Sequence, residues 1–380
     1  MTPTVTPTAP KTSLVYLDLN HWIQLTKARV GHRDGARYRG LLELLRARTR
    51  TGEIQTALSG EHYFEITAAI TSIRQRNDLA LTMAELSRYA TLASRDKLLR
   101  FEFRAALAKT LGVPAPKGDV PDPVGLGAGY AFGHPLRGRI RGRGSDVPGL
   151  FDDHAQKMIA AAEKLVGGGW RYSGSRDIPD GREQIEAVFN EATEYILLRG
   201  PKPEDLDRLR SEYGYRPEGA IAMVERIAER EQHIADSLRT DEDLRRRLDD
   251  VVAGTTYAYD LMPEILSAAL KELGCAWEDF AKLRKVAMSA ILMDTPILEV
   301  EGALRRGNLK DGFYTIKRND IYDLAALGVA VVYCGIVGTD RSAVHRLKVG
   351  GVESKYRCRI MSTPEDLVEA LEGASGTTSG

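Results

Sequence analysis

The chain has 380 residues, 43% of them hydrophobic, which is enough for one large domain with an insertion or for two domains. Its 53 Lys and Arg residues balance its 53 Asp and Glu residues, so any contact with nucleic acid has to come from local patches rather than from net charge. The 3 cysteines are far apart and odd in number, which argues against a disulfide framework or a zinc motif and favours a reducing cytoplasm.

Both ends of the chain have the composition of flexible segments. Residues 1–13 (MTPTVTPTAPKTS) are rich in Thr and Pro and lack the regions of a signal peptide, so we expect a disordered leader. The small, polar residues 374–380 predict a disordered tail. No uninterrupted apolar run is long enough to span a bilayer. These features predict a cytoplasmic protein without membrane association.

Strands and helices alternate in the first part of the chain. The apolar run LVYLDLN at 14–20 predicts a strand that ends at Asp18, and Asn20 is placed to cap a helix that runs to about residue 30. A helix over 38–48 and a brief strand over 54–58 follow. Ser59 then caps a helix in which Glu61 and Glu65 lie four apart on one face.

The middle of the chain has a different pattern. Apolar spacing predicts a continuous helix over 79–109 and a succession of charged amphipathic helices over 150–293. Between them, the Gly- and Pro-rich segment 112–149 is not expected to hold regular structure. Within it, alternating arginines suit either phosphate contacts by a flexible strand or a solvated loop, and they are Arg137, Arg139, Arg141 and Arg143.

Strand and helix signals return near the C-terminus. Asp320 and Asp323 lie three apart in the predicted first turn of a helix, so their carboxylates project from one face. Val331–Val337 is predicted to be a buried strand that leads to Asp340. A helix over 341–348, a strand over 356–361 and a last helix from residue 364 complete the pattern.

These patterns predict an α/β domain made of residues 14–75 and 290–373, interrupted by an all-helical insertion at 76–289. Open α/β folds build their sites at the carboxyl ends of strands, so Asp18 and Asp340 are expected to be neighbours. Packed carboxylates repel each other unless a cation joins them, which makes Mg²⁺ or Mn²⁺ the expected cofactor. Taken singly, Asp320 and Asp323 have an ordinary explanation as helix caps, and His21 as a packing residue.

Four motifs resemble those of the PIN-domain nucleases, a family with a compact three-layer fold around a mainly parallel sheet. They are VYLDLNHWI with Asp18, LSGEHYFEI with Glu65, RNDIYDL with Asp320, and GIVGTDR with Thr339 and Asp340. The resemblance covers the two ends of the chain and not the insertion. It implies a metal-dependent endoribonuclease that acts on RNA rather than DNA.

The resemblance implies Asp18, Glu65, Asp320 and Asp340 as catalytic metal ligands, with Asp323 as an auxiliary acid. The expected substrate contacts are Asn20, Thr339, Arg341, Arg346, Arg139 and Arg141. Two alternatives stay open. In one, the chain is a non-catalytic scaffold whose helical insertion binds a protein partner. In the other, which the residues after Asp18 favour less, it is a phosphatase of the haloacid-dehalogenase kind.

Overall fold

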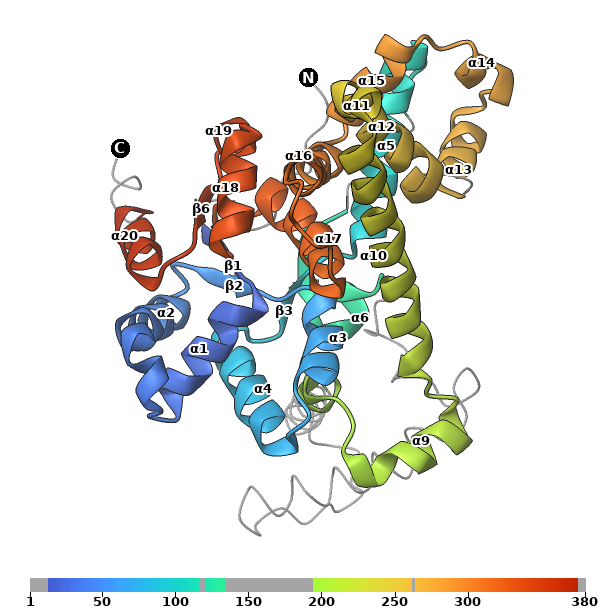
Figure 1. The fold of residues 1–380 in the computed structure, drawn as a ribbon. Helices are drawn as coiled ribbons and strands as arrows, with labels where there is room; N and C mark the ends of the chain where they lie inside the picture. The colour runs from blue at the N-terminus through green and yellow to red at the C-terminus, as the bar shows by residue number, and fades with distance from the viewer. Residues whose placement is uncertain (1–12, 116–120, 134–193, 262–263, 375–380) are drawn as a thin grey trace, which may run out of the picture.

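The computed structural model describes residues 13–115, 121–133, 194–261 and 264–374. Apart from Ser13 and Ala374, the expected disordered leader and tail lie outside the described residues. The arginine run at 137–143 and much of the expected insertion also lie outside them. Figure 1 shows a mostly helical molecule with a small sheet near its centre.

The central sheet is built from the two ends of the chain, as the sequence predicts. Its strands are all parallel in the order β2-β1-β5-β6, with bounds β1 Leu14–Leu17, β2 Gln55–Ala57, β5 Ile336–Gly338 and β6 Arg359–Met361. In the register, Tyr16 pairs with Ala57 on one side and with Val337 on the other. The coarse prediction of an α/β class with a mainly parallel sheet is therefore confirmed.

Most of the described chain outside this sheet is helical. In the first part they are α1 Leu19–Arg29, η2 Arg33–Tyr38, α2 Arg39–Thr51, α3 Gly60–Ala69, α4 Ile73–Ser87, α5 Arg95–Leu111 and α6 Gly127–Ala131. In the middle they are η3 Pro203–Asp205, α9 Leu206–Tyr213, α10 Pro217–Thr240, α11 Glu242–Arg246, α12 Leu248–Thr255, the π-helical turn η4 Thr256–Leu261, α13 Glu264–Leu273, α14 Trp277–Ala281 and α15 Lys285–Met293. The last are α16 Pro296–Lys310, α17 Arg318–Tyr333, α18 Arg341–Val349, α19 Val352–Tyr356 and α20 Pro364–Ala374.

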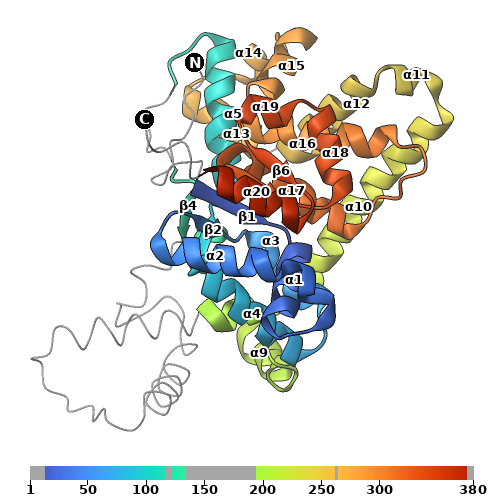
Figure 2. The same cartoon turned by 90° about the vertical axis from the view of Figure 1, so that its left-hand side faces the viewer.

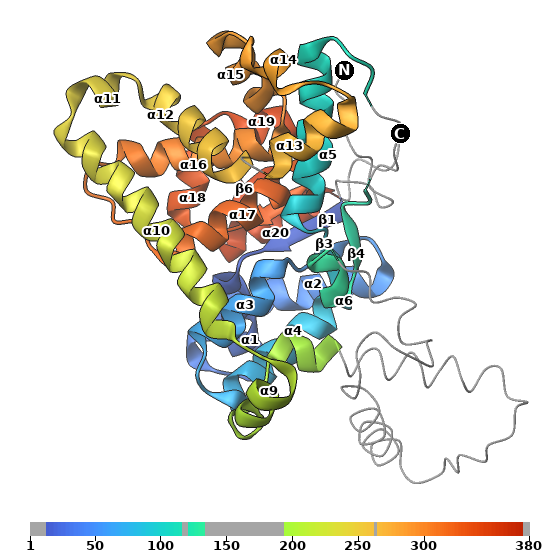
Figure 3. The same ribbon diagram turned by 90° about the vertical axis from the view of Figure 1, so that its right-hand side faces the viewer.

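Hydrophobic cores cover both faces of the sheet, because alternate strand residues point to opposite sides. Val15 and Leu17 enter one core with side chains of α1, α2, α4 and α20. Leu14 and Tyr16 enter the other with side chains of α5, α16, α17, α18 and α19. Figure 2 shows α2 and α20 on the near side of β1, and Figure 3 shows α5 and α16 from the opposite direction. The second core mixes side chains from both expected parts of the chain.

The predicted continuous helix over 79–109 is wrong. Helix α4 ends where Arg88 and Tyr89 take left-handed backbone conformations, with φ of 51° and 59°. The chain then forms β3 (Ala90–Leu92), which pairs antiparallel with β4 (Val124–Leu126). Leu58, which follows β2, exchanges backbone hydrogen bonds with β3, so this separate two-stranded sheet lies beside the β2 edge of the central sheet. The described part of the insertion is therefore not all-helical, and β4 and α6 give regular structure to part of the 112–149 segment.

The predicted strand over Val331–Val337 is also wrong in most of its length. Helix α17 continues to Tyr333, and the strand β5 covers only Ile336–Gly338. The last two turns of α17 are apolar all round because they are buried on every side. A short apolar run cannot distinguish a buried helix from a buried strand. Similarly, part of the predicted strand at 356–361 belongs to α19, and the strand begins at Arg359.

Two helix starts place acidic residues at the edge of the sheet. Asp18, rather than the expected Asn20, caps α1, and its Oδ1 accepts a hydrogen bond of 3.0 Å from the His21 amide. Ser59 precedes α3 as predicted, in a capping box with His62.

Among the described helices, none combines the length and apolar character needed to cross a membrane.

Candidate functional site

The carboxyl ends of β1 and β5 bring Asp18 and Asp340 to one edge of the sheet. The Asp18 amide donates a hydrogen bond of 2.9 Å to the Gly338 carbonyl, so the two strand ends are in register. Gly338 permits this closeness, because a Cβ there would lie 2.8 Å from the Leu17 side chain. Asp340 caps α18, and its Oδ1 accepts hydrogen bonds from the amides of Ser342, at 2.6 Å, and Ala343, at 3.0 Å.

Helix α3 contributes Glu61 and Glu65 to the same place. Burial, together with the negative charges of Glu61 and Asp18, raises the pKa of Glu65 to about 8. Burial also raises the pKa of Glu61. The choice of Glu65 over Glu61 from the sequence is thus incomplete, because the helix period puts both side chains at this site.

Helix α17 contributes Asp320 and Asp323, which have different surroundings. Asp320 accepts hydrogen bonds from the Lys317 amide, at 2.6 Å, and from the Tyr314 hydroxyl, so it completes the start of the helix. Asp323 is instead surrounded by other acids. Burial raises its pKa well above the usual range, and the charges of Asp18, Glu65, Asp340 and Asp320 add to the effect. The structure therefore gives Asp323 the central position, and Asp320 a capping role.

We refer to these six acids as the carboxylate cluster, and they are Asp18, Glu61, Glu65, Asp320, Asp323 and Asp340. Burial and the nearby charge of Asp340 raise the pKa of Asp18, which is only 5% exposed. Arg318 is one of the nearby bases: its charge lowers the pKa of Glu65, and it also forms an ion pair of 3.5 Å with Glu225 of α10. The cluster thus contains more acidic than nearby basic side chains. Its carboxylates are partly removed from water and repel one another, and both effects disfavour their ionised forms.

The cluster is not a closed metal site in this conformation. Across residues 13–115, 121–133, 194–261 and 264–374, no three His, Cys, Asp or Glu side chains lie close enough together to hold a metal ion. The carboxylates interact through their charges but not at coordination distances. Their oxygen donors do suit a hard divalent cation such as Mg²⁺ or Mn²⁺, as the sequence suggests.

The expected substrate contacts are dispersed around the cluster. Thr339 is fully buried, and its side chain lowers the pKa of the Asp18 carboxyl. Asn20 and Arg341 are exposed near the starts of α1 and α18. The Arg346 guanidinium lies over the Tyr314 ring, 4.3 Å from its centroid. Arg139 and Arg141 lie outside the described residues.

His21 is a packing residue, as the sequence suggests. It is buried, its Nδ1 lies 3.0 Å from the Tyr38 hydroxyl, and its Nε2 lies 3.4 Å from the Thr339 carbonyl. Its ring holds the end of β5 against α1, and therefore helps to fix the positions of Asp18 and Asp340.

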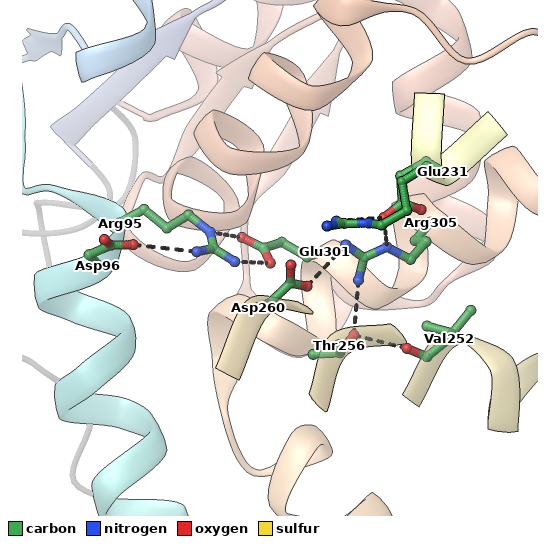
Figure 4. Close-up of polar contacts among 9 residues, drawn as sticks. Arg95, Asp96, Glu231, Val252, Thr256, Asp260, Glu301 and Arg305 are labelled. Atoms are coloured by element: carbon green, nitrogen blue, oxygen red, sulfur yellow. Dashed lines mark hydrogen bonds and ion pairs between the residues drawn. The ribbon is translucent and has the colours of Figure 1, made fainter. Parts of the chain in front are cut away.

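A second group of charges lies beside the cluster, and its members come from four elements (Figure 4). We call it the buried ion network, and it contains Arg95 of α5, Glu231 of α10, Asp260 of η4, and Glu301 and Arg305 of α16. Arg95 donates to both carboxylate oxygens of Glu301, with the Nη2–Oε2 distance at 2.7 Å. Arg305 lies 3.2 Å from Glu231 and 3.0 Å from Asp260. The charge of Arg95 also lowers the pKa of Glu61, which places the network next to the cluster.

Sequence reasoning did not include three residues in the site: Glu61, which it noted only beside Glu65, and Arg318 and Tyr314. Glu61 was visible as the partner of Glu65 one helical turn away. Arg318 acts on Glu65, which is far from it in the sequence, so no local pattern could reveal the contact. Tyr314 carried no such signal, because it precedes the helix and reaches Asp320 only through the turn that the chain makes at 311–316.

Comparisons of the chain with family models, with curated proteins and with solved structures found no match.

Proposed function

We propose that this protein is a metal-dependent phosphodiesterase of the PIN-like kind that cleaves RNA. The observation that carries the proposal is the convergence of acids from two strand ends and two helices on one edge of a parallel sheet. Asp323 has four other carboxylates near enough to raise its pKa. Buried carboxylates without matching bases are costly, and a divalent cation is the usual means of offsetting such charge.

The fold agrees with this proposal in its general features. The parallel sheet has helical layers on both faces, and the acids follow β1 and β5 at its carboxyl edge. Open α/β sheets bind ligands at this edge. The PIN-like topology and the preference for RNA rest on the motif resemblance and belong to the proposal.

The residues that would hold the cation are Asp18, Glu65, Asp323 and Asp340, with Glu61 beside them. A bound Mg²⁺ or Mn²⁺ would supply charge neutralisation of the phosphate and a lowered pKa for the attacking water. The chain itself keeps the acids in place. Asp18 and Asp340 each use Oδ1 to cap a helix, and His21 and Thr339 hold the two strand ends together. Arg318 lies where it can contact a phosphate near Glu65.

The non-catalytic scaffold is the second candidate. It is favoured by the finding that, within the described residues, no three donors lie at coordination distance. In that case the cluster would serve only to start helices, as Asp320 does, and the expected insertion would bind a protein partner through α10.

One assay separates these candidates. Single-stranded RNA, single-stranded DNA and a generic phosphomonoester are incubated with the full chain and Mg²⁺ or Mn²⁺, with EDTA as the control. The proposal expects metal-dependent cleavage of RNA. Cleavage of the phosphomonoester alone would favour the phosphatase, and no cleavage of any substrate with either metal would favour the scaffold.

A further inference from the structure

We propose that Phe313 is a stacking platform for a nucleobase of the single-stranded substrate, placed beside the carboxylate cluster. This inference rests on the proposed function and adds a substrate contact to it. Phe313 lies between α16 and α17 and is 97% exposed, more than any other large hydrophobic side chain among the described residues. Single exposed apolar residues are common, so exposure alone would carry no conclusion.

The backbone that carries Phe313 is held in place. The Phe313 amide donates to Asp311 Oδ1 at 3.1 Å, and the Tyr314 amide donates to the Asp311 carbonyl at 3.0 Å. Helix α10 fixes the same segment from the side, because Arg239 donates to the Tyr314 carbonyl at 2.6 Å and Gln232 accepts from the Ile316 amide at 2.8 Å. Figure 3 shows this connection running beside α10. Because the backbone is already fixed, binding a ligand to the ring does not carry the added cost of ordering a loop.

The position of Phe313 relative to the cluster follows from its neighbour. Tyr314 donates a hydrogen bond from its hydroxyl to Asp320, and successive Cα atoms are about 3.8 Å apart. The Arg346 guanidinium lies over the face of the same Tyr314 ring. The stem of Arg346 packs on α16 at Gly307, where a Cβ would lie 2.5 Å from it. Asp320, the Tyr314 ring and the Arg346 guanidinium thus contact one another in turn, and the exposed Phe313 is the residue next to Tyr314 in the chain.

Local charge favours nucleic acid as the partner. Lys310 and Lys317 are exposed at the two ends of the segment that carries Phe313. Together with Arg346 they place cations where a phosphate backbone would leave the carboxylate cluster. Every nucleobase offers a flat face to an aromatic ring, but only in a single strand is that face free. Single-stranded nucleic acid therefore fits this surface, and a duplex does not.

Binding measurements on the full chain test the inference. A fluorescein-labelled single-stranded RNA is titrated in EDTA, which prevents cleavage, with wild type, Phe313→Ala, Phe313→Leu and Phe313→Trp. Loss of one base–aromatic stack corresponds to a weakening of roughly 5- to 150-fold in Kd for Phe313→Ala. Phe313→Leu, which keeps an apolar but not an aromatic side chain, is expected to bind as weakly. Phe313→Trp keeps an aromatic ring and is expected to retain the affinity of the wild type, with quenching of the new indole's fluorescence on addition of RNA.

Trp277→Ala is the matched control, because Trp277 is also an exposed aromatic residue, at 48%, but lies on α14 at the far end of the molecule in Figure 1. It is expected to bind as wild type does. Wild-type affinity in Phe313→Ala, or in Phe313→Leu, would overturn the stacking inference. If wild type binds RNA in the Phe313-dependent way but cleaves nothing with Mg²⁺ or Mn²⁺, the proposed function fails and the stacking inference stands. If Phe313→Ala instead disrupts only a protein–protein contact and leaves RNA binding intact, the surface serves a protein and the inference is wrong.

Discussion

The carboxylate cluster and the buried ion network are adjacent groups of charge with opposite organisation. In the network, Arg95 and Arg305 alternate with Glu301, Asp260 and Glu231, so each acid lies near a guanidinium (Figure 4). In the cluster, Arg318 lowers the pKa of Glu65 and Arg95 lowers that of Glu61, so six acids lie near two guanidinium groups. The network is a structural solution to buried charge, because its charges neutralise each other within the chain. The cluster leaves an excess of negative charge that the described chain does not offset.

The two groups also differ in how the fold supports them. Glu301 lies against Gly328 of α17, where a Cβ would be 2.9 Å from the glutamate side chain, so the network lies within the packing of helices. The cluster lies at the edge of the sheet, where Asp18, Asp320 and Asp340 accept hydrogen bonds from backbone amides at helix starts. Charge matched inside a core predicts a role in stability, and charge left unmatched at a sheet edge predicts a role in binding.

The largest effect is expected from removing the centre of the cluster. Asp323→Asn or Asp18→Asn should lower metal-dependent RNA cleavage by at least about 100-fold, because each removes a ligand. The melting temperature without metal should stay equal or rise, since repulsion is relieved. Asp320→Asn should cost less activity, because Asp320 already caps α17. Asp249→Asn, an exposed acid on α12, is the control. Full activity in Asp323→Asn would remove Asp323 from the site.

Breaking the network should affect stability rather than chemistry. Glu301→Gln leaves Arg95 with the exposed Asp96 as its remaining ion-pair partner, and removing one member of a buried ion pair costs about 3–5 kcal/mol of unfolding free energy. Denaturant titration of the full chain measures this loss. Glu272→Gln is the matched control, because it breaks an exposed ion pair with Arg104 on the same helix α5 and should cost no more than about 1 kcal/mol. Equal losses in both variants would contradict the contrast drawn here.

Metal binding should distinguish the two groups thermodynamically. At a concentration about 100 times its Kd, Mn²⁺ should add about 2.7 kcal/mol to the stability of the wild type. The same Mn²⁺ concentration should raise the melting temperature of Asp18→Asn much less, and should still raise that of Glu301→Gln. Thermal melting of the three proteins with and without Mn²⁺ measures this. A full shift in Asp18→Asn would place the metal elsewhere.

A smaller effect is expected in the pH dependence of the metal-free protein. The pKa of Glu65 is about 8 in the folded state and about 4.5 as its ordinary value. At pH values between these two pKa values, Glu65 is deprotonated in the unfolded chain and protonated in the folded chain. The stability of the folded protein should therefore fall as pH rises through this range. Melting in EDTA at several pH values across this window measures the slope. Glu65→Gln should flatten it, and an unchanged slope in that variant would show that other groups cause it.

Local sequence patterns predicted the elements that carry the cluster. An apolar strand ending in an acid, a serine before an amphipathic helix, and acids in a helix's first turn each depend on interactions within a few residues. Asp18 and Asp340 were identified on this basis, whereas Glu65 was selected by the motif resemblance, and the parallel sheet from the two chain ends was predicted with them. Patterns of uniform apolarity were less informative, because they allow both a buried helix and a buried strand, as at Val331–Tyr333.

The sequence by itself determined which acids stand at helix starts and strand ends, because capping and strand alternation are local and leave local signatures. Only the tertiary structure decided that Asp323 rather than Asp320 is central, that Glu61 joins the site, and that β3 interrupts the helix after Ser87 by pairing with Leu58. The buried ion network was likewise invisible, since Arg95 and Glu301 are 206 residues apart. Such contacts depend on how helices pack, and packing is set by the whole chain rather than by any one stretch of it.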